Sequence, residues 1–319
     1  MLEGLPSVDL LNGVESALPE KIGICLRVPA IYLARGSVGE TVRWRKMPWE
    51  GRWMSSNQDQ VFEKYRYKIE NGRENSSRND ALEFHYTKKH LEGLITKNDR
   101  VLEIGCGTGY YGFYYADQCR EYVGIDLFPP HIELFHQRIE ERNLKNVSCQ
   151  VGDATNLGHI PDSSFDVVLS LGPMYHLPED ERKCAFSEAA RICKPGGILA
   201  FAYIVSVGTY AGSCVAYDDE RHIYPNAEAT EYVFEQGTDD LRPGLFYYTM
   251  PAEIEEMAAQ YGLGKIKNLG TNFMFAAKFV NDMTDERFEL MRPIYDKMAS
   301  SESCTGLAGH ALLVCTKYA

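Results

Sequence analysis

The fold is decided by the stretch Val101-Leu-Glu-Ile-Gly105-Cys-Gly107-Thr-Gly109. A short apolar run leads into three glycines at alternate positions, and a helical pattern follows. Glycines allow a tight turn and let the backbone approach a ligand with no Cβ in the way. The pattern predicts a buried strand, a turn that binds a ligand and a helix, although turns also use glycine for conformation alone.

The spacing of these glycines separates two kinds of nucleotide site. Dinucleotide sites use G-x-G-x-x-G, in which the last glycine lets the helix pack closely under a pyrophosphate. Tyr110 stands at that position here. The spacing G-x-G-x-G with the acidic Glu103 two residues upstream favours an adenosyl-sulfonium ligand, which has no phosphate.

Short apolar runs alternate with amphipathic stretches from Ala81 onward, as βαβ units require. This alternation predicts an α/β fold with a doubly wound, mostly parallel sheet. The predicted strands are 100–104, 122–126, 147–151, 165–171, 198–205, one near Ile266 and 311–316. The predicted helices are 81–95, one from Pro130 onward with Ile132, Phe135 and Ile139 on one face, 179–193, 251–261 and 284–299.

Two aspartates follow predicted strands. Asp126 lies about 20 residues after Gly105, the separation expected for a carboxylate that accepts both ribose hydroxyls. The alternative for Asp126 is a cap on the following helix. Asp153, in Val151-Gly-Asp-Ala154, is placed to accept from an adenine amino group, and its alternative is a simple turn aspartate.

At this point the sequence resembles the class I S-adenosylmethionine-dependent methyltransferases. Five segments carry the resemblance in the family's order: Val101–Gly109, Gly124-Ile-Asp126, Gly152-Asp-Ala154, Phe165-Asp-Val-Val168 and Cys193-Lys-Pro-Gly-Gly197. The resemblance implies a seven-stranded sheet with an antiparallel last strand and a donor across the carboxyl ends of the first strands. The cofactor residues that it implies are Glu103, Gly105, Cys106, Gly107, Asp126, Leu127, Asp153, Ala154 and Leu171.

Two further stretches, Leu171–Leu177 and Phe246–Ile254, are similar to the bacterial small-molecule branch of this family. The implied activity moves a methyl group from S-adenosylmethionine to an O or N nucleophile of a small molecule, leaving S-adenosylhomocysteine. His176, after the fourth strand, is the candidate base that takes the acceptor's proton, and its alternative is a structural histidine. Tyr175, Tyr247 and Tyr248 are candidates for an acceptor pocket, although tyrosines at such positions are more often core.

The family motifs leave residues 1–80 uncovered, and we expect this N-terminal extension to act as a lid on a methyltransferase domain at 81–319. Within that domain, the aromatic segment 206–250 interrupts the alternation. We expect it to be a cap insertion that closes over the acceptor together with the extension.

The composition bears on partners and location. A formal net charge of -12 opposes binding to nucleic acid, although an RNA or protein methyltransferase stays open as an alternative, as does a non-catalytic protein that binds the donor. The longest early apolar stretch, 22–34, contains Arg27 and Pro29 and is too short to span a membrane. Acidic residues near the N-terminus argue against a secretory signal, so we expect a cytoplasmic protein.

The residues that commonly bind metals show no metal-site pattern. The nine cysteines form no C-x-x-C pair, and we expect reduced thiols. His131 and His136 are five residues apart and face different sides of their predicted helix. No metal is predicted.

Overall fold

The computed structural model describes residues 61, 62, 64, 65, 71–216, 230, 231, 233 and 246–318. The contacts divide the chain after Gly36, and all described residues belong to the second unit, Ser37–Ala319. None of the described helices has both the length and the apolar character needed to cross a membrane.

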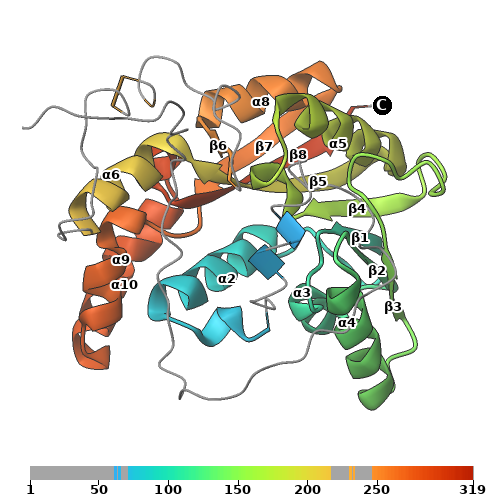
Figure 1. Ribbon diagram of the computed structural model, residues 1–319, viewed down its shortest axis with the longest axis horizontal. Coiled ribbons are helices and arrows are strands. Elements are labelled where there is room, and N and C mark those ends of the chain that lie inside the picture. The colour runs from blue at the N-terminus through green and yellow to red at the C-terminus, as the bar shows by residue number, and fades with distance from the viewer. Residues whose placement is uncertain are drawn as a thin grey trace, which may run out of the picture. The chain divides into compact units, whose positions relative to one another are not determined.

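A central mixed sheet organises the second unit (Figure 1). Its seven main strands follow the order β3-β2-β1-β4-β5-β8-β7, and only β8 runs antiparallel to its neighbours. A two-residue strand, β6, pairs with the end of β5. The predicted doubly wound sheet with an antiparallel last strand is confirmed. The strands are β1 (Arg100–Ile104), β2 (Glu121–Asp126), β3 (Val147–Val151), β4 (Phe165–Ser170), β5 (Cys193–Val205), β6 (Tyr248–Thr249), β7 (Leu263–Gly270) and β8 (His310–Lys317).

Helices cover both faces of the sheet, because the central strands are apolar on both sides. Buried residues of α5 and α8 pack on one face, and those of α3 and α4 pack on the other. Figure 1 shows these pairs on opposite sides of the strands. The helices are α2 (Arg78–Leu91), α3 (Tyr110–Tyr115), α4 (Pro129–Glu141), α5 (Glu179–Ile192), α6 (Ser206–Ala216), α8 (Pro251–Gln260), α9 (Met274–Asp282) and α10 (Asp285–Ala299), with 3-10 turns at Arg73–Asn75, Pro173–Tyr175 and Glu302–Leu307.

The largest departure from the predicted element boundaries is in β5. The sequence predicts a start at Ile198, after a Pro-Gly-Gly stop, whereas the strand begins at Cys193. Cys193 pairs with Phe165 and Ile198 pairs with Val167, so residues 194–197 bulge out of the ladder. A bulge lets proline and glycines sit inside a strand without a ladder hydrogen bond.

The aromatic segment 206–250 is described only in part. Residues 206–216 form α6, and residues 248 and 249 form β6 at the end of β5. Most of 217–245 and all of 1–60 lie outside the described residues. The lid and cap assignments of these parts therefore stay predictions.

Candidate active site

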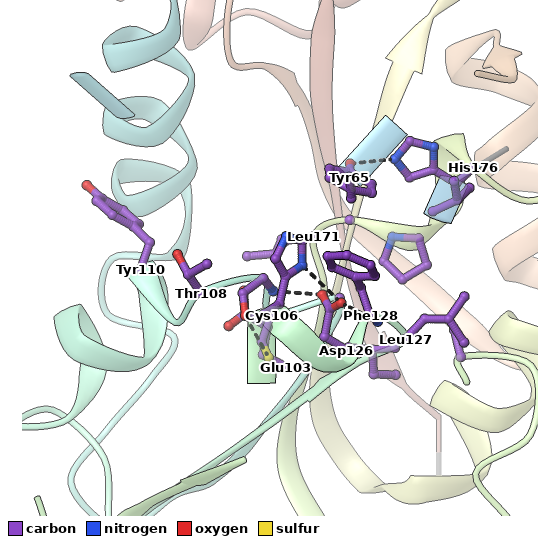
Figure 2. Close-up of a pocket in the computed structure, with 18 of the residues that line it drawn as sticks. Tyr65, Glu103, Cys106, Thr108, Tyr110, Asp126, Leu127, Phe128, Leu171 and His176 are labelled. Atoms are coloured by element: carbon purple, nitrogen blue, oxygen red, sulfur yellow. Dashed lines mark hydrogen bonds and ion pairs between the residues drawn. The ribbon is translucent and has the colours of Figure 1, made fainter. Parts of the chain in front are cut away.

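A cavity of about 1190 Å³, partly open to solvent, lies at the carboxyl ends of β1, β2 and β4. In doubly wound folds, ligands bind at the carboxyl ends of the parallel strands. Of the predicted site residues, the cavity brings together Glu103, Gly105, Cys106, Gly107, Asp126, Leu127, Asp153, Ala154, Leu171, Tyr175 and His176. Figure 2 shows several of them around it.

The glycine turn after β1 forms one wall of the cavity. The N–H groups of Gly105 and Cys106 both donate to the Ile125 carbonyl, at 2.7 and 2.9 Å, which ties the turn to β2. Gly105 and Gly107 have φ values of +77° and +53°, a region that disfavours residues with a Cβ. A Cβ on Gly107 would meet no protein atom within 4 Å, so the space beside it is open.

Asp126, at the end of β2, accepts three hydrogen bonds (Figure 2). The Gly107 N–H donates to Oδ2 at 2.8 Å. The Phe128 N–H and the His131 ring nitrogen Nδ1 both lie at Oδ1, at 2.9 and 3.1 Å. Asp126 thus links the glycine turn to the start of α4 while lining the cavity, and it is not a helix cap, because α4 has Phe128 as its N-cap with no side-chain cap hydrogen bond.

Asp153 also has a local role beside its place in the cavity wall. Its Oδ1 accepts from the backbone N–H and the hydroxyl of Thr155, at 2.9 and 2.8 Å. This is the turn aspartate that the sequence left open as an alternative. Asp153 and Ala154 nevertheless both line the cavity.

Glu103 is the most deeply buried carboxyl group at the site, with 1% of its surface exposed. Burial raises its pKa to about 8, because a charged carboxylate loses its hydration in the interior, and the nearby Asp126 charge adds to the rise. The Tyr122 hydroxyl donates to Oε2 at 2.6 Å and partly opposes the shift. Glu103 therefore holds a proton at neutral pH in this state of the protein.

His176 lies at the opposite end of the cavity from the glycine turn (Figure 2). It follows the 3-10 turn Pro173–Tyr175 and is 7% exposed. Its Nε2 lies 2.9 Å from the hydroxyl of Tyr65. Tyr65 also makes edge contacts with the rings of His131 and His176, at 5.2 and 5.7 Å between centroids. This N-terminal tyrosine therefore bridges the two ends of the cavity.

The three tyrosines predicted for an acceptor pocket do not lie in one place. Tyr175 lines the cavity, whereas Tyr247 and Tyr248 do not. Tyr247 is buried, with the Arg182 guanidinium 5.8 Å from its ring centroid, and Tyr248 belongs to β6. Their neighbour Phe246 lies instead against the His176 ring, at 5.2 Å.

The comparisons with known proteins agree with this geometry. Residues 101–197 match the family model described as a methyltransferase domain. This range holds the glycine turn, both aspartates and His176. Residues 101–197 form a class I S-adenosylmethionine-dependent methyltransferase domain.

Several curated relatives of the domain are methyltransferases of small molecules. Erythromycin 3''-O-methyltransferase of Saccharopolyspora erythraea is 32% identical over 35% of this chain and 36% of its own length. The 27-O-demethylrifamycin SV methyltransferase of Amycolatopsis mediterranei is 34% identical over 38% and 45%. Phosphoethanolamine N-methyltransferase 1 of Arabidopsis thaliana is 31% identical over 48% and 28%. The chain thus spans less than half the length of each of these relatives.

Solved structures share the fold of the methyltransferase domain. A putative methyltransferase in complex with the Haloferax volcanii Trm112 activator has a TM-score of 0.53 at 19% identity, covering 81% of this chain and 98% of that chain. A protein from Pyrococcus horikoshii has a TM-score of 0.52 at 18% identity, covering 80% and 98%. At these identities the likeness shows the fold alone.

The methyltransferase domain fits its family's cofactor, S-adenosylmethionine. The turn at Gly107 leaves open space beside the backbone, where a side chain would otherwise project. Two carboxylates, Asp126 and Asp153, face the same cavity and supply acceptors for hydroxyl and amino groups. No group of three or more potential metal-binding side chains gathers anywhere in the described ranges.

Sequence reasoning missed part of the cavity wall of the methyltransferase domain. Phe128 and His131 come from the first turn of α4, close behind Asp126, and their position after the acidic residue was a usable signal. Phe62 and Tyr65 come from a segment with no clear periodicity, and nothing in the sequence pointed to the contact of Tyr65 with His176. Others that were missed include Val61, Arg73, Phe84, Thr108, Tyr110 and Tyr111.

Proposed function

We propose that the chain is an enzyme that transfers a methyl group from S-adenosylmethionine to an O or N nucleophile of a small molecule by in-line displacement. The observation that carries this proposal is a single cavity with the glycine turn and Asp126 at one end and His176 at the other. The small-molecule relatives support the class of acceptor.

The residues around the glycine turn would bind S-adenosylmethionine at the donor end of the cavity. Glu103, Gly105 and Gly107 are assigned to the methionine and ribose portions, and Asp126 to the ribose. Asp153 and Ala154 are assigned to the adenine, with Cys106, Leu127 and Leu171 as further contacts. When bound, S-adenosylmethionine supplies a methyl group on a positively charged sulfur, already activated for displacement. The protein's contribution is then mainly to hold acceptor and methyl group in line, which is worth up to ~7–11 kcal/mol of the barrier.

The acceptor end would take up the proton that the nucleophile loses. His176 is assigned as the base, because its ring reaches the cavity between two aromatic neighbours, Tyr175 and Phe246. The Tyr65 hydroxyl lies at Nε2, so an acceptor hydroxyl or amine either replaces it there or passes its proton through it. The surrounding rings exclude water and favour an acceptor with apolar surface.

A test of this proposal is turnover with methyl-labelled donor and fractionated small metabolites, followed by mass spectrometry of the labelled product. Total RNA and protein extracts serve as parallel acceptors. Label in a small molecule supports the proposal. Label only in RNA or protein, or donor binding without turnover on any fraction, overturns it in favour of the two alternatives.

The role of His176 is tested with His176→Gln in the same assay. We expect kcat to fall roughly 10²–10⁴-fold, because the variant has no base at the acceptor, while affinity for S-adenosylhomocysteine stays within about twofold. The control is His159→Gln, at an exposed histidine whose ring bonds only to Gln150 among the described contacts. Equal kcat in the wild-type chain and His176→Gln would remove His176 from the mechanism.

A further inference from the structure

His131 is a buried ring of the cavity wall that the proposed function leaves without a role. It lies in the first turn of α4 and is 2% exposed. Its ring makes edge contacts with Phe128 and Tyr65, at 5.0 and 5.2 Å between centroids. It is therefore held rigidly beside Asp126 at the donor end.

The hydrogen bonds at Asp126 limit what its carboxylate can still accept. A carboxylate offers about four acceptor positions, two on each oxygen. Phe128 and His131 donate to Oδ1 and fill it, while Gly107 takes one position on Oδ2. One position remains, on Oδ2. The sequence suggested that Asp126 accepts both hydroxyls of a ribose, yet it has room for one without giving up a protein hydrogen bond.

A second acceptor lies next to it. Because a carboxylate oxygen can only accept, the proton in the contact with Asp126 is on Nδ1 of His131, and the tautomer that carries it there leaves Nε2 as an acceptor with a lone pair. Nε2 is fully buried and has no hydrogen-bond partner among the described residues. A buried acceptor without a donor is costly, so a ligand that supplies a donor there gains affinity.

We propose that two residues share the donor's ribose: Asp126 Oδ2 accepts one hydroxyl and His131 Nε2 accepts the other. This inference rests on the proposed function, since the ribose is that of S-adenosylmethionine. His131 acts in two ways, because its Nδ1–H also fixes the orientation of the Asp126 carboxylate. It is a residue for donor binding, with no part in the proton transfer at His176.

Three variants separate the direct contact from the orienting one. His131→Asn keeps a donor near the Nδ1 position and removes the group at Nε2, whereas His131→Gln places an amide near Nε2. His131→Phe keeps the ring contacts with Phe128 and Tyr65 but has neither nitrogen. His136→Asn is the matched control, because His136 lies on the same helix with 65% of its side chain exposed.

The measurement is titration calorimetry of the full chain with S-adenosylhomocysteine and with its 2′-deoxy and 3′-deoxy analogues. We expect His131→Asn to bind S-adenosylhomocysteine roughly tenfold more weakly than the wild-type chain. For one of the two deoxy analogues, wild type and His131→Asn should bind equally, because the hydroxyl that Nε2 accepts is already missing. His131→Gln should recover part of the loss, and His136→Asn should bind as wild type does.

Two results overturn the inference alone: His131→Asn binds S-adenosylhomocysteine as tightly as wild type, or it loses the same factor with all three ligands. If His131→Asn does not fold, His131→Phe replaces it: because it also lacks the donor to Asp126, it should weaken binding of all three ligands, least for the analogue that lacks the hydroxyl at Nε2, and an equal factor for all three overturns the inference. A wild-type chain that binds none of the three ligands would overturn the proposed function as well, so the two failures are distinguishable.

Discussion

At the scale of single residues, Glu103 is a carboxyl group whose burial makes the stability of the protein depend on pH. Its carboxyl is buried at the end of β1, and only Tyr122 donates to it in the described part of the chain. The raised pKa, about 8, means that the folded protein keeps a proton that the unfolded chain releases near 4.5. Between these two pH values folding takes up a proton, so stability falls as the pH rises through this window.

Replacement of Glu103 by Gln removes this proton uptake. We expect the free energy of unfolding of the wild-type chain to drop between pH 5 and pH 8.5 by up to a few kcal/mol more than that of Glu103→Gln. Urea unfolding at the two pH values measures the difference, and exposed Glu133→Gln is the control. A Glu103→Gln variant with the same pH dependence as wild type would contradict the raised pKa.

At the scale of elements, two glycines of the turn between β1 and α3 have different roles, one in folding and one in ligand binding. Gly109 caps α3 with φ +89°, and a Cβ there would come within 2.2 Å of the Phe135 ring. Gly107 has φ +53° but faces open space in the cavity wall. Gly109 therefore allows close packing against Phe135, and Gly107 leaves room for a ligand.

Alanine substitutions at the two glycines should have different effects. Gly109→Ala should lower the free energy of unfolding by about 2–4 kcal/mol, because strain in the backbone adds to the clash with Phe135. Gly107→Ala should cost only about 1 kcal/mol but weaken S-adenosylhomocysteine binding roughly tenfold or more, because its Cβ enters the ligand's space. Urea unfolding and calorimetry check both. Equal losses of stability in the two variants would refute this division.

The same elements show what the sequence could predict. β1, β3 and the apolar face of α4 follow directly from the local sequence: β1 is a short apolar run that is buried almost throughout, β3 alternates apolar and polar residues, and α4 has apolar residues at helical spacing. The early start of β5 was not predictable, since the bulge at residues 194–197 depends on pairing with β4. Proline and glycine residues indicate a turn, and the local sequence cannot show that one strand continues before and after them.

At the scale of the whole molecule, the cavity wall at the glycine turn was predictable, and the wall around His176 largely was not. Glu103, Gly107 and Asp126 lie at the ends of consecutive elements, and the order of parallel strands brings them together. The contact between Tyr65 and His176 spans 111 residues of sequence, and no pattern in a single sequence indicates it. Tyr247 and Tyr248 are not in the cavity wall: Tyr248 pairs with Ile204 of β5, and the backbone N–H of Tyr247 donates to the Tyr175 carbonyl.

The central claim is that the cavity beside the glycine turn binds an adenosyl nucleoside through Asp126. Titration calorimetry of the full chain with S-adenosylhomocysteine tests it most directly, with Asp126→Ala as the variant and exposed Asp117→Ala as the control. We predict one binding event for the wild-type chain, unchanged in Asp117→Ala and weakened roughly tenfold to a hundredfold in Asp126→Ala. No binding heat with the wild-type chain, or equal affinity in wild type and Asp126→Ala, would contradict the claim.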